Sequence, residues 1–255
     1  MSVLDQFRLD GKTAIVTGGN SGIGYAIANG LAEVGADVVI ANRTRNEGKE
    51  AADKIAADTA SETLAIPTDV TDEDEVSGLV EKTVTEFGSI DVLVNNAGVA
   101  FHAPAEEKSL DQWKTTIDIN LTGTFLCAKY AGQAMIDNRG GSIINISSMS
   151  AFIANHPQKH TDYQASKAGM EGFKNQLASE WAEYGIRVNN INPGYVETEI
   201  LSDDPDERQV WKDEMLQEEF ADPEDIAPLA VYLASDASSY VTGSSIVIDG
   251  GYTVR

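Results

Sequence analysis

Tyr163 and Lys167 are the two side chains whose types and spacing most suggest chemistry. They are four positions apart in the segment Tyr-Gln-Ala-Ser-Lys, so a helix would place the phenol and the ammonium on one face. A phenol with a pKa of about 10 exchanges protons poorly at neutral pH unless a nearby cation stabilises its phenolate. Ser147 and Ser148 end the preceding apolar run, where the sites of α/β proteins assemble. These residues indicate general acid–base chemistry.

Residues 17–24 (TGGNSGIG) form a glycine-rich turn between the first apolar run and the first helical pattern. Because Gly18, Gly22 and Gly24 lack a Cβ, the chain can turn tightly and a pyrophosphate can approach N–H groups at a helix N-terminus. The spacing differs from the commoner G-x-G-x-x-G, but its position at the first strand-to-helix turn predicts a dinucleotide site. The other cofactor contacts predicted in this turn are Asn20, Ser21 and Ile23.

The end of the second apolar run, which should read the adenosine ribose, offers Asn42 and Arg43 and no carboxylate. An Asp or Glu there would bind the ribose 2′-hydroxyl, whereas Arg suits a 2′-phosphate. Asp37 is at the wrong end of the run to reach the ribose. We therefore predict that Asn42 and Arg43 contact the cofactor and that NADP(H) is favoured over NAD(H).

The elements that must position these residues alternate along the whole chain. Short apolar runs, typical of strands covered on both faces, alternate with helical patterns, which implies parallel pairing. The runs are residues 13–16, 38–41, 63–67, 91–94, 141–146, 187–191 and 245–248. The helical stretches are residues 23–33, 47–58, 73–87, 110–135 and 163–184. This pattern predicts an α/β protein with a single-domain Rossmann fold, a doubly wound seven-stranded parallel sheet with helices on both faces.

No linker or internal repeat divides the chain, so residues 1–255 are predicted to form one dinucleotide-binding and catalytic domain. Only residues 198–222 break the alternation of runs and helical patterns. This stretch is acidic and contains Pro205, and it lies between two regular elements. We expect it to form an insertion above the sheet.

The catalytic and glycine-rich segments together resemble the short-chain dehydrogenase/reductase family, and the resemblance covers nearly the whole chain. The turn at residues 17–24 matches the family's T-G-x-x-x-G-x-G motif. The other matching segments, in family order, are Asp69-Val70, Asn95-Asn96-Ala97-Gly98, the catalytic four Asn120, Ser148, Tyr163 and Lys167, and Pro193-Gly194-Tyr195-Val196-Glu197-Thr198. Several separated motifs in the correct order make chance agreement negligible.

This resemblance implies a role for each matching residue. Tyr163 would exchange a proton with the substrate oxygen, and Lys167 would lower the Tyr163 pKa and bind the nicotinamide ribose. Ser148 would hydrogen-bond the substrate oxygen, Asn120 would hold a water linked to Lys167, and Thr198 would anchor the carboxamide, with residues 198–222 as a substrate lid. The implied cofactor contacts are Asp69, Val70, Asn96, Ala97, Gly98, Tyr163, Lys167, Pro193, Gly194, Val196 and Thr198.

The assignment of the catalytic serine leaves alternatives. Fifteen positions separate Ser148 from Tyr163, more than in many family members, so Ser147 and Ser150 are rivals of Ser148. The extended stretch at 149–162 is expected to border the substrate pocket. The predicted substrate contacts are Ser148, Ser150, Asn155, His156 and Tyr163, with Gln158 also at the rim.

The sequence predicts an enzyme that transfers a hydride between NADP(H) and a small carbonyl or secondary alcohol. Residues 147–158 and 236–255 look most like family members that act on sugar alcohols, ketoses and sugar acids, including mannitol dehydrogenases, sorbose reductases and gluconate dehydrogenases. The alternative is a 3-oxoacyl-thioester reductase. It is disfavoured because such an enzyme must bind an acidic carrier protein or a phosphorylated pantetheine, whereas the expected lid is itself acidic at 203–207 and 213–225. A catalytically silent cofactor sensor is a further alternative, although such a protein would be expected to lose Tyr163 or Lys167.

Composition excludes several other classes. With 41 acidic and 18 basic residues the formal net charge is −23, and no basic cluster suits nucleic acid or an anionic membrane. The acidic excess suggests a salt-adapted surface as a hypothesis. The first ten residues show no secretory signal, so a cytoplasmic protein is expected, and family members of this length suggest a homotetramer.

The remaining chemically active side chains are predicted to have structural roles. A single cysteine, Cys127, excludes an internal disulfide and is expected in the core. No metal site is expected, because His102, His156 and His160 lack paired ligands and are interpreted as surface or pocket-rim residues.

Overall fold

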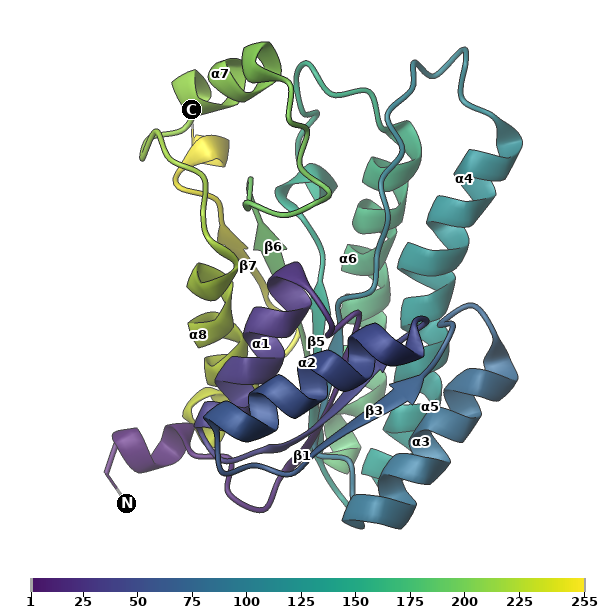
Figure 1. Cartoon of the computed structure of the whole chain (residues 1–255), viewed down its shortest axis with the longest axis vertical. Helices are drawn as coiled ribbons and strands as arrows, with labels where there is room; N and C mark the ends of the chain where they lie inside the picture. Colours follow the sequence, from purple (N-terminus) through teal and green to yellow (C-terminus); the bar gives the residue numbers. More distant parts are fainter. Residues whose placement is uncertain (1, 255) are drawn as a thin grey trace.

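One parallel seven-stranded sheet runs through the centre of the protein (Figure 1), in the order β3-β2-β1-β4-β5-β6-β7. The computed structural model describes residues 2–254. The strands are β1 (Thr13–Thr17), β2 (Asp37–Asn42), β3 (Thr63–Pro67), β4 (Val92–Asn95), β5 (Gly141–Ile146), β6 (Ile186–Pro193) and β7 (Ser245–Ile248). The strand order reverses between β1 and β4, which gives the predicted doubly wound α/β fold. The prediction of seven parallel strands is confirmed.

Helices cover both faces of this sheet. One face carries α1 (Gly22–Glu33), α2 (Arg45–Asp58) and α8 (Pro223–Ala234), and the other carries α3 (Glu73–Phe87), α5 (Gly123–Asp137) and α6 (Thr161–Trp181). Two helices extend beyond the sheet, α4 (Leu110–Ile117) and α7 (Pro205–Glu214). Short 3₁₀ turns are Leu4–Phe7, Met149–Ala151, Ala182–Tyr184, Asp236–Ser238 and Tyr252–Val254.

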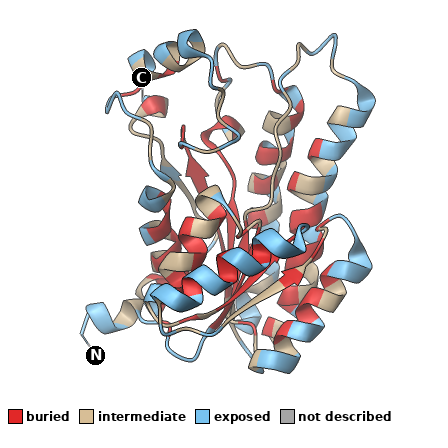
Figure 2. Cartoon of the chain, in the orientation of Figure 1, coloured by how far each residue is buried: buried red, intermediate tan, exposed pale blue. Residues whose placement is uncertain are grey.

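The strands contain apolar runs because the side chains of these runs alternate between two buried cores. In β1, Ala14 and Val16 pack with α1 and α8, whereas Ile15 packs with α3 and α5. All five β1 residues are buried, as Figure 2 shows for the central strands. Full burial of a side chain such as Ile15 stabilises the fold by about 1.5–3 kcal/mol, which explains the continuous apolar runs. Cys127 is also buried in this core, as expected.

Two helical predictions differ from the structure at the site. The stretch predicted as helical at 110–135 is interrupted by a π-helical turn, Asp118–Thr122, between α4 and α5. A π turn adds one residue to a helical turn and is frequent at functional sites. Helix α6 begins two residues before Tyr163, at Thr161, and its core ends at Trp181 before a 3₁₀ turn.

The inserted stretch at 198–222 contains α7, and the chain then enters α8, which the sequence analysis did not name. Helix α7 packs on an aromatic cluster in which the rings of Tyr195 and Trp211 stack with centroids 4.5 Å apart. Tyr252, near the end of the chain, meets Tyr195 edge-on at 5.4 Å. Helix α7 of the insertion is therefore connected through Tyr195 to the 3₁₀ turn Tyr252–Val254. Among residues 2–254, no helix combines the length and apolar character needed to cross a membrane.

Candidate active site

Two adjoining cavities lie at the carboxyl ends of the strands, where parallel α/β sheets bind ligands. The larger has a volume of about 860 Å³ and the smaller about 130 Å³. Residues that line both include Asn96, Gly98 and Thr198, so the two form one continuous site. The larger is of the size that accommodates extended cofactors.

The glycine-rich turn forms the floor of the larger cavity. Gly18 has φ +62°, and a Cβ on it would come within 3.0 Å of the Asn96 amide nitrogen. That amide donates to the carbonyls of Thr17 at 3.0 Å and Gly18 at 3.2 Å, which ties the turn to the end of β4. A Cβ on Gly24 would come within 2.2 Å of the Gly18 carbonyl. Side chains at Gly18 and Gly24 would collide with the protein itself, so this tight turn requires glycine, and its place at the N-terminus of α1 beside the cavity fits a pyrophosphate group.

The opposite end of the larger cavity carries charges of both signs. Arg43 and Asp69 line it, and their opposite charges interact. The pKa of Asp69 is lowered, chiefly because the Thr71 backbone N–H donates to its carboxylate, with a smaller effect of the Arg43 charge. An exposed cation at this place fits an adenosine ribose phosphate.

Glu47 adds a carboxylate to this end of the cavity that the sequence analysis did not consider. It lies in the first turn of α2, beyond the strand end that sequence reasoning inspected, and it lines the cavity. The Asn20 side-chain amide donates to its carboxylate at 3.2 Å. A negative charge therefore lines the same end of the cavity as Arg43. The sequence signal for it was a glutamate in the first turn of the helix that follows the second strand.

Tyr163 and Lys167 line the smaller cavity from the same face of α6, as the spacing predicts. The Lys167 Nζ lies 5.4 Å from the centre of the Tyr163 ring and donates to the Ile146 carbonyl at 2.7 Å. Burial lowers the pKa of Lys167 to about 8. Burial also raises the pKa of Tyr163, opposed by a hydrogen bond with Ser148. The expected lowering by Lys167 is not seen here, because its ammonium is directed to the Ile146 carbonyl, and it stays a prediction for the cofactor-bound protein.

The three candidate serines have different partners. Ser148 interacts with Tyr163, and its hydroxyl also donates to the Ser150 hydroxyl at 3.0 Å. The Ser147 hydroxyl instead donates to the Lys167 backbone carbonyl at 3.2 Å. Ser148 is thus the one of the three that contacts the phenol directly, with Ser150 behind it.

Asn120 is buried in the π turn between α4 and α5 and lines neither cavity. Its amide oxygen accepts from the Val99 backbone N–H at 2.8 Å, and its amide nitrogen donates to the Val99 carbonyl at 3.0 Å and the Ser166 hydroxyl at 3.1 Å. These bonds connect the loop after β4 to α6. In this arrangement the side chain fixes the loop that borders the cavity.

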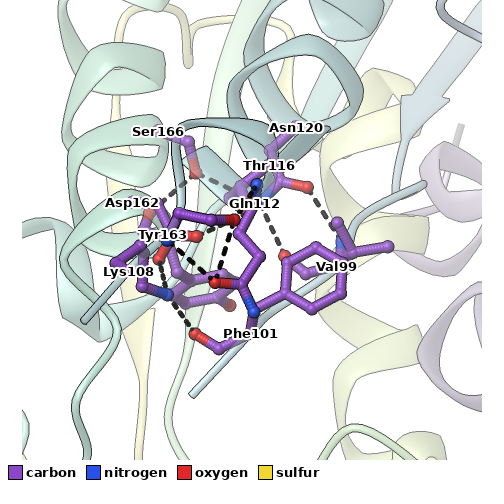
Figure 3. A network of polar contacts seen from close by, with 10 residues as sticks. Val99, Phe101, Lys108, Gln112, Thr116, Asn120, Asp162, Tyr163 and Ser166 are labelled. Carbon is purple, nitrogen blue, oxygen red and sulfur yellow. Dashed lines mark hydrogen bonds and ion pairs between the residues drawn. The ribbon is translucent and has the colours of Figure 1, made fainter. Parts of the chain in front are cut away.

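A buried ion pair holds the start of α6 (Figure 3). The Lys108 Nζ lies 2.7 Å from the Asp162 Oδ1, and the side chains are 4% and 0% exposed. The Thr116 hydroxyl donates to Asp162 Oδ2 at 2.8 Å, and Lys108 also donates to the Phe101 carbonyl. Burial raises the pKa of Asp162, but the bonds from Lys108 and Thr116 outweigh it, so that pKa is lowered. Because Asp162 precedes Tyr163, this network fixes the position of the phenol.

The structure brings together nearly all of the predicted cofactor contacts. Every one except Gly24 lines one of the two cavities: Gly18, Asn20, Ser21, Gly22, Ile23, Asn42, Arg43, Asp69, Val70, Asn96, Ala97, Gly98, Tyr163, Lys167, Pro193, Gly194, Val196 and Thr198. Gly24 instead allows the close contact with Gly18 described above. The two cavities therefore bring together the residues that the sequence analysis expects to contact a dinucleotide.

The predicted substrate contacts divide into two groups. Ser148, Ser150 and Tyr163 line the smaller cavity, and Gln158 does too. Asn155 is buried outside the lining and donates to the Tyr195 hydroxyl at 3.3 Å, and His156 is exposed. His102 and His160, interpreted from the sequence as surface or pocket-rim residues and not as substrate contacts, also line this cavity. The proximity of His160 to Tyr163 along the chain was the signal that could have found it. No metal-binding cluster of His, Cys, Asp or Glu occurs within residues 2–254.

Comparison with known proteins gives this site a context. A family model described as enoyl-(acyl carrier protein) reductase matches residues 18–253. The D-threitol dehydrogenase of Mycolicibacterium smegmatis is 42% identical over 100% of this chain and 98% of its own. A sorbose reductase of Candida albicans is 40% identical, over 99% and 90%. An NADP-dependent mannitol dehydrogenase of Hypocrea jecorina is 38% identical, over 99% and 96%.

Solved structures agree in fold over the full length. A short-chain type dehydrogenase/reductase from Mycobacterium marinum superposes with a TM-score of 0.97 at 41% identity, covering 100% of both chains. A gluconate 5-dehydrogenase from Burkholderia cenocepacia, solved with NADP and tartrate, has a TM-score of 0.95 at 33% identity, also covering 100% of both. The likeness therefore extends over both cavities and the insertion above them.

Proposed function

Because this chain belongs to the short-chain dehydrogenase/reductase family and is an oxidoreductase of alcohol groups, we propose that it interconverts a secondary alcohol and a ketone of a sugar, polyol or sugar acid, with NADP(H) preferred. The observation that carries this proposal is the contact of Ser148 and Lys167 with Tyr163 in the smaller cavity, which adjoins the larger one. Bound in the larger cavity, a nicotinamide cofactor supplies or accepts the hydride.

Tyr163 moves the proton of the reaction. Its phenol is protonated at neutral pH, since burial raises its pKa, so it can give a proton to the substrate oxygen in reduction. In oxidation the same oxygen takes the alcohol proton. Ser148 donates to the substrate oxygen, where negative charge develops as hydride is added to the carbon. In the cofactor-bound protein we expect the Lys167 ammonium to stabilise the deprotonated form of the phenol.

Residues at the other end support the choice of cofactor. Arg43 is exposed at the mouth of the larger cavity, where its guanidinium can pair with a ribose 2′-phosphate. The mannitol dehydrogenase relative is named as NADP-dependent, and the gluconate 5-dehydrogenase structure contains NADP. The negative charge of Glu47 at the same end of the cavity would repel a 2′-phosphate. The selectivity for NADP(H) over NAD(H) is therefore expected to be moderate.

The substrate class is supported by the polar wall of the smaller cavity and by relatives named for threitol, sorbose and mannitol. Gln158, for example, accepts from the Tyr195 hydroxyl at 3.2 Å and borders the space beside Tyr163. Such side chains can hydrogen-bond several hydroxyls at once. The acidic insertion, with Asp203 and Asp206 exposed, disfavours the acidic carrier proteins that deliver acyl thioesters.

A substrate screen tests the proposal. Nicotinamide absorbance is followed with NADPH and NADH over a panel of ketoses, keto-acids of sugars, polyols and acetoacetyl thioesters. The proposal expects the highest kcat/KM for a sugar or polyol substrate with NADP(H). A higher kcat/KM for the thioesters would favour the acyl reductase alternative, and cofactor binding without turnover would favour a sensor.

The proposal includes a homotetramer, as is common for family members of this length. Leu110, Trp113 and Phe125 are 65%, 40% and 47% exposed on α4 and α5, and Val247 is 39% exposed on the edge strand β7. Apolar surface of this kind supports contacts between copies through the helices and the C-terminal strand. Light scattering with and without added salt measures the mass of the particle and shows whether assembly depends on salt, as a salt-adapted acidic surface would require. A monomer mass in both conditions would reject the homotetramer.

A further inference from the structure

His160 is a buried histidine beside the reactive phenol for which the mechanism above has no role. It lines the smaller cavity and is only 5% exposed. The centre of its ring lies 5.2 Å from the Tyr163 ring and 5.7 Å from the His102 ring, which meets it edge-on. His160 therefore borders the space that a substrate must enter to reach Tyr163.

The imidazole of His160 is not satisfied by the protein itself. Its Nε2 is shielded from solvent and has no hydrogen-bond partner among the described residues. Buried polar atoms almost always have partners, and an exception at a cavity wall points to a ligand that supplies the bond. Because Nε2 is shielded in the present ring orientation, a ligand in the cavity would reach a ring nitrogen through rotation of the ring about its Cβ–Cγ bond.

The surroundings of this ring keep it uncharged. Burial lowers the pKa of His160 to about 4, the charges of His102 and Lys108 lower it further, and Asp162 opposes them. A neutral imidazole offers one N–H donor and one acceptor nitrogen. A hydroxyl, which donates and accepts, matches both, whereas a carboxylate only accepts and meets no positive charge on this ring.

We propose that His160 binds a second hydroxyl of the substrate, next to the carbon that exchanges hydride, and thereby selects neutral polyols and ketoses over mono-alcohols and sugar acids. This inference rests on the proposed function and identifies its specificity-determining residue. Gln158, on the same cavity wall and fixed by the Tyr195 hydroxyl, provides the adjoining polar contact.

His156 is the matched control in the same loop. It is exposed and does not line the cavity, although the sequence analysis included it among the expected substrate contacts. Replacing His156 changes a histidine at the surface, whereas replacing His160 changes the cavity wall. The two substitutions therefore separate recognition in the cavity from a general effect of the loop.

The experiment compares one polyol with its deoxy analogue that lacks the hydroxyl next to the reacting carbon. The polyol chosen is the best neutral substrate of the screen, and both compounds are assayed with wild type, His160→Phe, His160→Gln and His156→Phe. In wild type the polyol should have the higher kcat/KM. In His160→Phe the ratio of the two kcat/KM values should fall by at least about ten-fold, because the ring keeps its volume and loses both nitrogens.

His160→Gln should keep more of this ratio than His160→Phe, and His156→Phe should leave it unchanged. An equal fall of kcat/KM for the polyol and for the deoxy analogue in His160→Phe would indicate a structural role. It would overturn the inference about His160 and leave the proposed function standing. An unchanged ratio in His160→Phe does the same. If wild type turns over no sugar or polyol, the proposed function and the inference fail together, so the two failures are distinguishable.

Discussion

The two ends of the site are built in different ways. The end that fits pyrophosphate and adenosine consists of backbone at strand ends and of exposed side chains such as Arg43 and Glu47. The end that contains Tyr163 consists of buried polar side chains that hydrogen-bond one another, and Lys167 is 4% exposed. Substitutions at the first end should therefore alter affinity modestly, and those at the second should alter catalysis or stability strongly.

The largest effect is expected for Tyr163→Phe, which removes the proton donor and keeps the ring. Loss of a positioned general acid typically reduces the rate by about 10²–10⁴-fold, and we expect kcat to fall within this range. Cofactor affinity should change little, since Tyr163 does not line the larger cavity and the substitution removes only a hydroxyl. Steady-state kinetics and fluorescence titration with the cofactor measure the two quantities.

An equal kcat in Tyr163→Phe and wild type would reject the proton-transfer role. A matched loss of cofactor affinity would instead show that the substitution disturbs the fold, and thermal unfolding of the variant distinguishes that case.

Asp162→Asn tests the second end through stability. The substitution leaves the Lys108 ammonium buried, at 4% exposure, without its carboxylate. Breaking a buried ion pair in this way costs about 3–5 kcal/mol of unfolding free energy. Urea unfolding at neutral pH measures it, and the kcat of the folded variant should also fall, because Asp162 positions Tyr163.

The exposed pair Lys49–Asp53 gives the control, with side chains 67% and 65% exposed. Asp53→Asn should change the unfolding free energy by less than about 1 kcal/mol. Equal losses in the two variants would contradict the contrast drawn between buried and exposed charges.

Local pattern was sufficient to predict most of the fold. Continuous apolar runs such as 38–41 predict strands because burial on both faces of a parallel sheet requires them. The π turn at Asp118–Thr122 was not predictable, since nothing in its composition distinguishes it from the helices on either side. It depends on tertiary bonds, above all those of Asn120 with Val99 and Ser166.

The candidate site shows the same difference between features set by local sequence pattern and features set by tertiary contacts. The glycine-rich turn could be predicted because a pyrophosphate cradle needs contiguous residues of one type. The pair of Lys108 and Asp162 was not predicted, because 54 positions separate them and only the fold brings them together. Glu47 and His160 were not predicted to contact a ligand for a related reason, since only the fold shows that they line the cavities.

The pH dependence of stability should identify His160 as a buried neutral group. Its pKa is about 4 in the folded protein against 6.5 for an unperturbed histidine, so between these values only the unfolded state takes up the proton. Stability from this group is thus present above pH 6.5 and declines as the pH falls toward 4. From pH 7 to pH 5 the loss amounts to about 2 kcal/mol.

Urea unfolding of wild type and His160→Gln at pH 7 and pH 5 measures this decline. The variant should lose less stability than wild type by about 2 kcal/mol, because glutamine does not titrate. His156→Gln, changed at an exposed position, should keep the wild-type decline. The same decline in all three proteins would show that His160 takes up its proton in the folded state.

The smallest effects are expected at the adenosine end, from Arg43 and Glu47. Arg43→Leu should lower the preference for NADPH over NADH, measured as a ratio of kcat/KM values, by about five-fold, because the guanidinium is exposed and its pairing is screened by solvent. Glu47→Gln should raise the same ratio, since it removes the negative charge that lines this end of the cavity. Both effects should shrink as salt is added, because added ions screen exposed charges. If Arg43→Leu changed kcat even with NADH, which has no 2′-phosphate, Arg43 would act in the chemical step and not in cofactor selection. The contrast between the two ends of the site would then fail.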